Sequence, residues 1–520
     1  MNACLKLSTV AATGWLIHAA AAQESSLDRA GFLWSPHLEW ILRNPDRGEN
    51  PFDLEASVAF THAESGERRT TGMFHDGGDQ WKFRFTATRT GTWSFETRSG
   101  ASALDGKRGS IVIAATPVPA GRGFITSVDG TRWAWQTGED GDVKPFVPQL
   151  VMARDLSAYR DDPGKMESDI QTWIIEHGFN GIHLGVLCRW FDFDQVSSDR
   201  ITSPDPNPDP RTFEVLEQII ARVHGAGGMV HIWMWGDDSR RMTPVKWGIN
   251  GTADQRLQRY IAARLGPLPG WTMSYGFDLW EWVDGEQLAA WRANLHGHFG
   301  WPHLLGGRWE QNRLTQATET LDYASYEQHR PSYEKYLETI GERPGKPAFS
   351  EDRFRVRDPS PYPEKDYDLE MTRRGLWHST LAGGVANIWG YLVPAGDEGG
   401  SRPYPNRDEI LTYSRFFQNR FVRGMRPCNE RTAYERGVGI EENRVRACFG
   451  DPEASCFLFY AEDAETVRMD LRGMEETQPA LAVDALKPYR ELALEPLDPK
   501  EHEWKAPYKS TWAVAVGRFP

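Results

Sequence analysis

The chain has 520 residues, 22 of them tryptophan, and a formal net charge of −14 at pH 7. At roughly 150 residues per domain, this length predicts about three domains or one barrel with additions. An acidic chain without a basic run is not expected to bind nucleic acid or an anionic membrane surface. Tryptophan often lines pockets for the flat apolar faces of sugar rings, although most of these side chains must belong to the core.

The first 22 residues are expected to be a secretory signal peptide. Lys6 supplies a positive charge, residues 10–22 are mostly apolar, and three alanines precede Gln23, as signal cleavage requires. The apolar stretch is too short to cross a membrane. We therefore expect a secreted or periplasmic protein without a membrane span.

Four of the five cysteines follow this segment, and their spacing does not suggest a metal site. Cys448 and Cys456 flank a turn, and an oxidising compartment would allow a disulfide between them, or between Cys428 and one of them. Cys188 is expected to be a free thiol. Because the chain contains neither a CxxC motif nor a paired His/Cys cluster, we expect no metal and no cofactor.

Residues 23–118 predict an N-terminal β-sandwich. Short runs alternate apolar and polar residues at 57–61, 81–86, 91–97 and 110–115, and turn-forming clusters separate them. Gly91 stands in the turn of a predicted hairpin. This alternation is typical of strands with one buried face, as in a small sandwich.

Residues 119–427 predict an α/β fold, a (β/α)₈ TIM barrel. Eight apolar, strand-like segments alternate with segments of helical spacing. The remaining residues, 428–520, return to short alternating runs and predict a C-terminal β-sandwich. The eight barrel strands are expected at 147–153, 180–187, 228–235, 271–278, 303–307, 323–326, 347–349 and 385–389.

The ends of these strands carry the candidate site, because a barrel enzyme places its site at the carboxyl ends of its strands. Strand four ends in Asp278 and Glu281, and strand seven in Glu351. One acid of a facing pair can protonate a leaving oxygen while the other attacks the anomeric carbon or activates water. The other strand ends carry residues suited to binding sugar: Arg189, Trp190, Trp235, Asp237, Arg308, Trp309, Tyr326, Glu327 and Trp389.

Each candidate also has a structural explanation. The acids after strand four could cap a helix, since acids are favoured in a first turn. Glu351 could belong to a surface salt-bridge cluster, and the Arg-Trp pairs at 189–190 and 308–309 could be cation–π pairs in the core. Trp389 could plug the barrel. His183 and His231 lie within strands and are expected to be core residues.

Three segments resemble parts of clan A glycoside hydrolases, the (β/α)₈ retaining enzymes. LQRYIAARLGPLPGWTMSYGFD (257–278) resembles their helix and strand four, and KPAFSEDRF (346–354) resembles the end of strand seven. The resemblance implies that Glu351 is the nucleophile. GGVANIWGY (383–391) resembles strand eight, with Trp389 as a substrate platform. The three-part layout is similar to secreted bacterial apiosidase-like and collagenase-type barrels.

The chain departs from this family at strand four. Where the family has Asn-Glu, with the glutamate as acid/base, this chain has Phe277-Asp278. Asp278 would then be the acid, or Glu281 one turn further on. Because aspartate is one methylene shorter, the gap between the carboxylates would widen by roughly an ångström, towards the inverting separation of about 6.5–9.5 Å and away from the retaining one of about 5–5.5 Å.

The sequence therefore predicts a glycoside hydrolase that uses two carboxylates, with Glu351 as nucleophile or base and Asp278 or Glu281 as acid. One alternative is a non-catalytic carbohydrate-binding barrel, which Phe277-Asp278 would favour. Another is a polysaccharide lyase, with Tyr326 as base and Arg308 holding a uronate. The expected partner is a carbohydrate substrate. The oligomeric state, including a homo-oligomer, is left open.

Overall fold

The computed structural model describes most of the chain after residue 26. The predicted signal peptide lies outside the described residues, as do the side chains of residues 310, 311 and 386–389. The described ranges are 27–34, 37–46, 48, 50–116, 121–139, 141–153, 156–311, 316–343, 345–351, 354, 356, 363–389 and 406–519.

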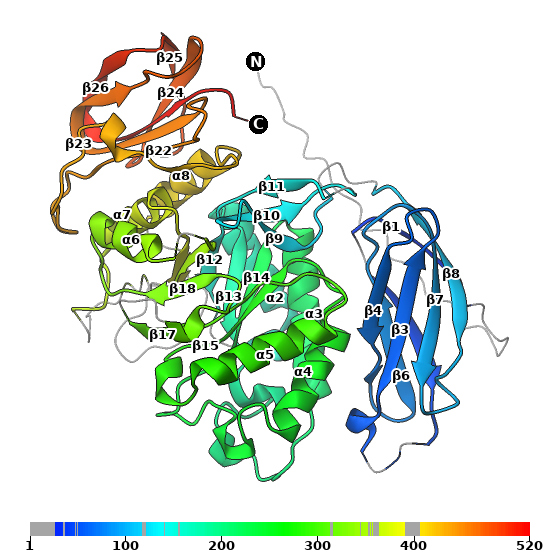
Figure 1. Cartoon of the computed structure of the whole chain (residues 1–520). Coiled ribbons are helices and arrows are strands. Elements are labelled where there is room, and N and C mark those ends of the chain that lie inside the picture. Colours follow the sequence, from blue (N-terminus) through cyan, green and yellow to red (C-terminus); the bar gives the residue numbers. More distant parts are fainter. Residues whose placement is uncertain are drawn as a thin grey trace, which may run out of the picture.

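The N-terminal region is a sandwich of two sheets, as predicted (Figure 1). The apolar residues of β3 alternate with half-buried polar ones, and Val58 and Phe60 enter the core. Trp40 and Phe83 stack there with ring centroids 4.9 Å apart. One sheet has the order β1(Arg29–Phe32), β8(Arg108–Ala114), β7(Gly91–Ser99), β3(Ala56–His62), β4(Arg68–Gly72), and the other β2(Leu38–Arg43), β6(Gln80–Phe85), β5(Phe74–His75).

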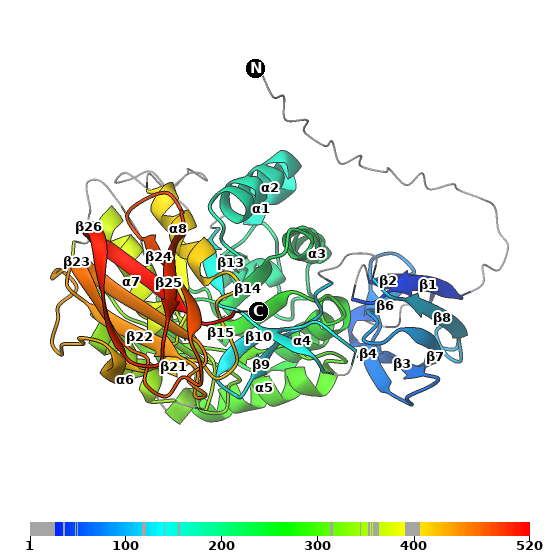
Figure 2. The same ribbon diagram turned by 90° about the horizontal axis from the view of Figure 1, so that it is seen from above.

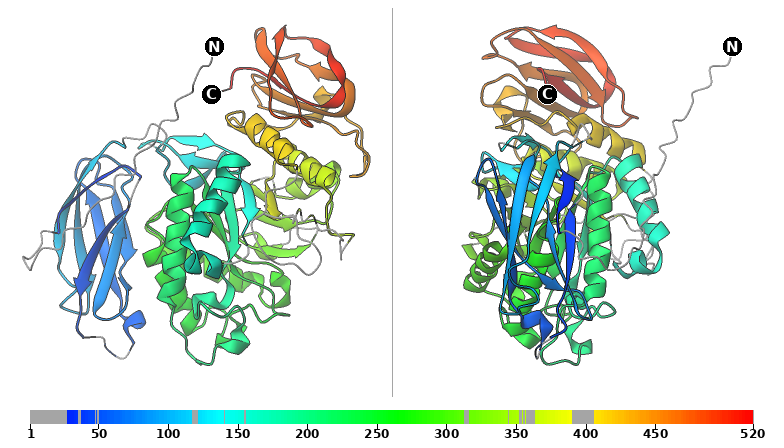
Figure 3. Two further views of the ribbon diagram at one scale, coloured as in Figure 1. Left: turned by 180° about the vertical axis from the view of Figure 1, so that it is seen from behind. Right: turned by 90° about the vertical axis from the view of Figure 1, so that its right-hand side faces the viewer.

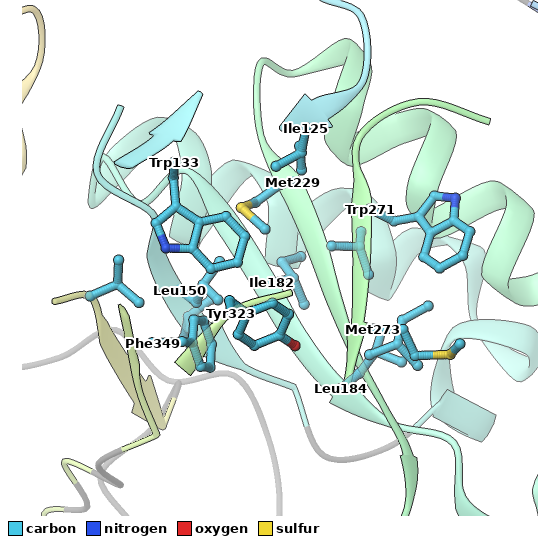
Figure 4. Close-up of a cluster of buried hydrophobic side chains, with 14 of the residues drawn as sticks. Ile125, Trp133, Leu150, Ile182, Leu184, Met229, Trp271, Met273, Tyr323 and Phe349 are labelled. Carbon is cyan, nitrogen blue, oxygen red and sulfur yellow. The ribbon is translucent and has the colours of Figure 1, made fainter. Parts of the chain in front are cut away.

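A small antiparallel sheet that the sequence did not predict joins the sandwich to the α/β core. It consists of β9 (Ile125–Val128), β10 (Arg132–Gln136) and β11 (Val143–Pro145). Trp133 of β10 packs on Tyr323 and donates its indole N–H to the carbonyl of Ala348, 3.0 Å away. Figure 4 shows Trp133 beside buried side chains of the parallel strands. The small sheet therefore covers the ends of these strands that lie away from the candidate acids.

The α/β core contains parallel strands in the predicted order, and they are divided between two sheets. The amide of Ser350 donates to the carbonyl of Val385 at 3.1 Å, between the last strand of one sheet and the segment before the edge strand of the other. Closure into one barrel stays a prediction. The larger sheet runs β16(Leu305–Gly306), β15(Trp271–Gly276), β14(Met229–Trp235), β13(Gly181–Gly185), β12(Gln149–Met152), β20(Ala386–Trp389), and the smaller β17(Arg308–Gln311), β18(Ala324–Glu327), β19(Ala348–Ser350).

Helices follow the strands and cover the outer faces of these sheets (Figures 1 and 2). Side-chain caps start several of them. Asp209 precedes Pro210 and accepts from the amide of Arg211, and Asp284 forms a capping box with Gln287. The helices are α1(Leu156–Asp161), α2(Pro163–Asp169) with the π-turn Ile170–Glu176, α3(Pro210–Gly225), α4(Thr252–Arg264), α5(Gly285–His298), α6(Tyr333–Gly341), α7(Leu369–Leu381) and α8(Arg407–Phe417). Short 3₁₀ turns are η1(Pro51–Asp53), η3(Leu187–Trp190), η4(Ser198–Arg200), η5(Val245–Trp247), η6(Leu279–Glu281), η7(Gln316–Thr318) and η8(Asn429–Arg431).

The C-terminal region forms one sheet, where the sequence predicted a sandwich of two. Two long strands, of 14 and 16 residues, carry bulges and bring the sheet's distal half over its own apolar face. The other face packs on α7 and α8. The antiparallel order is β21(Arg426–Pro427), β22(Arg446–Gly450), β23(Phe457–Asp470), β26(Glu501–Val516), β24(Gln478–Asp484), β25(Leu492–Leu497).

The four cysteines of the described chain are buried free thiols. Cys448 is therefore not bonded to Cys456 in this structure, and its thiol instead contacts that of Cys428. Cys188 is free, as predicted, and burial raises the pKa of its thiol to about 12.

The α/β core lies between the two outer β regions, which do not meet (Figure 3). Phe74 of the N-terminal sandwich packs in the hydrophobic core of the α/β region, and Trp301 of the α/β region packs in the hydrophobic core of the sandwich. In the described part of the chain, no helix is long and apolar enough to span a membrane.

Candidate active site

Three carboxylates surround one buried arginine at the carboxyl ends of the parallel strands. Arg308 places Nη2 3.1 Å from Asp278 Oδ1 and Nε 3.3 Å from Glu351 Oε2, and its Nη1 contacts Glu327. We call Asp278, Arg308, Glu327 and Glu351 the Arg308 cluster. Because Nε and Nη2 share one edge of the planar guanidinium, Asp278 and Glu351 meet along that edge. The sequence had predicted all four as site residues, from four different strand ends.

Glu351 is enclosed and held by hydrogen bonds. Its side chain is fully buried, the indole of Trp233 donates to Oε2 at 3.1 Å, and the hydroxyl of Ser325 donates to Oε1. Burial raises the pKa of Glu351 to about 7, and the charge of Asp278 adds to the rise, while Arg308 and these hydrogen bonds oppose it. Glu351 therefore changes its protonation near neutral pH, which is common for carboxyl groups at active sites.

Asp278 is the more accessible acid of the pair. Its side chain is 25% exposed, and its backbone has φ of +52°, in the left-handed region that a residue with a Cβ rarely adopts. Such strained positions gather at functional sites because the surrounding structure fixes a side chain there. The sharp turn after β15 thus directs the Asp278 carboxylate towards Arg308.

Phe277, where the related enzymes carry asparagine, contributes to an apolar wall. It forms a small cluster with Met152 and Trp233, and its ring centroid lies 4.5 Å from that of Trp233. The Arg308 guanidinium lies 5.5 Å from the centre of the Phe277 ring. One side of the Arg308 cluster is therefore apolar and low in dielectric, which strengthens its ion pairs.

The carboxylate of Glu281 binds a neighbouring loop. It is exposed, and its Oε2 accepts from the backbone amides of Asp238 at 3.0 Å and Ser239 at 3.4 Å. The Glu281 backbone amide donates to the carbonyl of Asp278 at 3.2 Å, but among the described residues the Glu281 carboxylate forms no hydrogen bond or ion pair with the side chains of the Arg308 cluster. Glu281 thus ties η6 to the loop after β14, and Asp278 remains the acid that faces Glu351. Asp284 caps α5, which is the structural explanation considered for the acids of this stretch.

Solved structures share this architecture. A candidate glycoside hydrolase from Bacteroides vulgatus ATCC 8482 superposes with a TM-score of 0.71 and 14% identity, over 94% of this chain and 99% of its own. A family 5 glycoside hydrolase from the same organism has a TM-score of 0.56 and 15% identity, over 77% of this chain and 95% of its own. The chain has a glycoside hydrolase-like fold. This agrees with the resemblance to clan A, and identities this low establish the fold alone.

The family comparison reaches only the N-terminal sandwich. Residues 34–100 match the model of a domain of unknown function, DUF5060. No curated protein matches the chain.

Three of the predicted sugar-binding side chains are buried, and the structure does not place them in the Arg308 cluster. Trp190 is fully buried and donates its indole N–H to the carbonyl of Met234 at 2.9 Å. Trp235 is also fully buried, with the ring of Phe191 5.9 Å away. Tyr326 is buried on the opposite face of β18 from the cluster, so the structure does not support it as the base of a lyase.

Arg189, Asp237 and Trp309, which were also predicted to contact sugar, lie outside the Arg308 cluster. Arg189 donates to the carbonyl of Phe193 in its own loop and lies over that ring. Asp237 is bound by Arg240 and Ser239; burial alone would raise its pKa, but these hydrogen bonds lower it below the ordinary value. Trp309 is half-buried against the core, and the side chain of Trp389 lies outside the described residues. Their contact with sugar stays a prediction.

Of the two residues that hold Glu351, sequence reasoning noted Trp233 near the end of strand three without choosing it as a site residue, and it did not consider Ser325. Ser325 lies inside a strand, and the strand alternation that places it on the same face as Glu327 was its signal. Below them His231 contacts His183 and the hydroxyl of Tyr323, at 2.8 and 2.7 Å. Burial lowers the pKa of His231 to about 3, so this ring is neutral and structural, as predicted.

Proposed function

We propose that the protein is a secreted glycoside hydrolase in which Glu351 and Asp278 form the catalytic pair, in a closed (β/α)₈ barrel. The observation that carries this proposal is that both carboxylates face one edge of Arg308 at the carboxyl ends of the parallel strands. Glycosidic cleavage uses two carboxyl groups that flank the scissile bond, one as proton donor and the other as nucleophile or base. The similarity of fold to glycoside hydrolases supports the same class of reaction.

In this mechanism the two acids have distinct tasks. Glu351, fixed by Trp233 and Ser325, attacks the anomeric carbon or activates water as its carboxylate. Asp278, which solvent reaches, donates a proton to the leaving oxygen. Arg308 orients both groups through its planar fork and lowers the repulsion between them.

Hydrolysis of a panel of polysaccharides and oligosaccharides, with release of reducing sugar as the readout, tests the proposal. Glu351→Gln should lower the rate on any hydrolysed glycan by at least about a thousandfold, since it removes the charge and keeps the shape. Glu281→Gln is the matched control and should keep most of the activity. Full activity in Glu351→Gln would show that another residue carries the reaction.

A non-catalytic carbohydrate-binding protein is the second candidate, and Phe277-Asp278 in place of Asn-Glu is the observation in its favour. It predicts that a glycan binds at the Arg308 cluster without turnover. Binding of intact oligosaccharides to the unmodified protein, with no product after long incubation, would favour this candidate over the hydrolase.

A further inference from the structure

A cleft separates the N-terminal sandwich from the helices of the α/β core. Its volume is about 650 Å³, and its walls come from β3, β4 and β7 on one side and from α4 and α5 on the other. The two walls approach closely at Gly72, where an added Cβ would lie 3.1 Å from that of Ala263. Figure 1 shows β4, at the edge of the sandwich, on the side nearest the core. The cleft is separate from the Arg308 cluster.

Basic side chains dominate this cleft, although the chain as a whole has a net charge of −14. Arg68 and Arg98 are exposed in its sandwich wall, and neither has an ion-pair partner among the described residues. In the opposite wall Arg259 is 31% exposed, with Asp53 3.6 Å away at the rim. Glu55 is the other acid that lines the cleft. The other arginines of the lining, Arg69, Arg256 and Arg259, are paired with Glu67 or Asp53, so Arg68 and Arg98 carry the positive charge of the cleft that has no ion pair among the described residues.

His298 shows that the opposite wall repels further positive charge. Burial lowers the pKa of His298, and the charge of Arg259 lowers it further, whereas Glu55 opposes the shift. Two basic side chains, one from α4 and one from α5, thus lie close to each other in the same wall of the cleft. A bound anion would relieve this repulsion and would complete the charge balance of the wall.

The positions of the arginines indicate the size of the occupant. Arg68 pairs with Thr61 and Arg98 with Ser57, so the two arginines lie beside positions of β3 four residues apart. At about 3.3 Å per residue, these positions are separated by about 13 Å. This spacing of backbone positions matches an extended ligand with several negative charges, which can contact each arginine separately.

We infer that this cleft binds a segment of an acidic oligosaccharide, through the carboxylates of uronates or through sulfate esters. The choice of a sugar over other polyanions rests on the proposed function. It also rests on the hydroxyl groups of Ser57, Thr70 and Ser99 in the lining, which can bind sugar hydroxyls. The N-terminal sandwich would then hold a polysaccharide at a distance from the Arg308 cluster, and the two sites would raise avidity for a long chain.

Calorimetric titration of Glu351→Gln with a galacturonate tetrasaccharide, a sulfated tetrasaccharide and a neutral cello-tetrasaccharide tests this inference. At least one acidic sugar should bind more tightly than the neutral one. Arg68→Gln and Arg98→Gln, each in the Glu351→Gln background, should weaken that binding about tenfold. Arg43→Gln in the same background is the matched control. Arg43 lies on β2, in the other sheet of the sandwich, where it is 67% exposed and pairs with Asp79. Because Arg43 is not part of the cleft, its substitution should not change the affinity.

Equal affinity for acidic and neutral sugars, or unchanged affinity in both cleft variants, would overturn the inference. Tighter binding of a single-stranded DNA oligomer than of either acidic sugar would also overturn it, in favour of a different polyanion. The result is independent of catalysis, because the titrated protein lacks the Glu351 carboxylate. If the acidic sugar binds through the arginines but the native chain hydrolyses no glycan, the proposed function is rejected and the inference of a sugar-binding cleft stands.

Discussion

The titration of one residue, Glu351, makes a prediction about the pH dependence of activity. Burial raises its pKa to about 7, so its carboxylate form predominates above pH 7 and is lost as the pH falls. If Glu351 is the nucleophile or base, kcat/KM should rise about tenfold for each pH unit below 7 and level off above it. Initial rates across the pH range would measure this, and a rate that instead falls above pH 7 would make Glu351 the proton donor.

A second prediction at the residue scale separates the two acids after β15. Asp278 contacts Arg308 at 3.1 Å, whereas Glu281 accepts from backbone amides of the neighbouring loop. Asp278→Asn should therefore lower kcat/KM by roughly a hundredfold or more, the usual contribution of a general acid, while Glu281→Gln should change it by less than about threefold. Thermal unfolding of both variants controls for folding. If Glu281→Gln proved the more damaging change, the acid would have been misassigned.

At the scale of elements, η6 and the loop after β14 depend on each other through Glu281. Its carboxylate accepts from the amides of Asp238 and Ser239. It therefore provides these two backbone N–H groups with the hydrogen-bond acceptor that a neighbouring strand would provide in a sheet. Glu281→Ala should speed hydrogen exchange of these two amides, measured by mass spectrometry of peptides covering residues 236–242. Glu286→Ala, an exposed change in the first turn of α5, is the control and should leave that peptide unchanged.

The elements also show which features the sequence could predict. Strand order in the core followed from local patterns, because each buried strand is a short apolar run followed by a helix. The acids were found because charged residues at the ends of such runs are conspicuous. The direction in which the aromatic side chains point was not predicted. Tyr326 lies between Ser325 and Glu327 and so points to the opposite face of β18, and Trp190 lies in a 3₁₀ turn with its side chain buried.

Long-range pairing explains the rest of the differences. The six C-terminal strands join in one sheet whose neighbours, such as β23 and β26, are far apart in sequence. No local pattern distinguishes one bent sheet from two stacked ones, because both bury alternate residues. The same holds for β9 to β11, whose short runs gain a partner only when the core has formed.

At the scale of the whole molecule, buried ion-pair networks connect the three regions. Arg264 of α4 binds Glu217 of α3 and Asp76 of the N-terminal sandwich, the latter at 2.9 Å. Glu462 of the C-terminal sheet connects that sheet to the α/β core in the same way, because it pairs with Arg374 and His378 of α7. Such networks specify how the outer regions dock, since any other arrangement would leave a charge buried without a partner.

Glu462 gives the last prediction, because its carboxylate is fully buried and accepts from Arg374 at 2.8 and 3.0 Å, from His378 at 2.8 Å and from the amide of Val445 at 2.8 Å. Glu462→Gln would leave the Arg374 charge unpaired and should lower the free energy of unfolding at pH 7 by about 3–5 kcal/mol. Urea unfolding followed by circular dichroism would measure the loss. Glu435→Gln, at a carboxylate that is 64% exposed, is the control and should cost less than about 1 kcal/mol.

The pH dependence of this loss distinguishes the effect of the lost charge from that of mismatched hydrogen bonds. Burial alone would raise the pKa of Glu462, but His378 and Arg374 hold it well below its ordinary value of 4.5. A carboxylate with a lowered pKa stabilises the fold above the unfolded pKa, and this contribution disappears as the pH falls through the folded pKa. The deficit of Glu462→Gln should thus be complete above pH 4.5 and shrink below it. A deficit that stays constant between pH 7 and pH 3 would mean that the mismatch between the amide NH₂ and the surrounding donors, and not the lost charge, weakens the contact of the C-terminal sheet with α7.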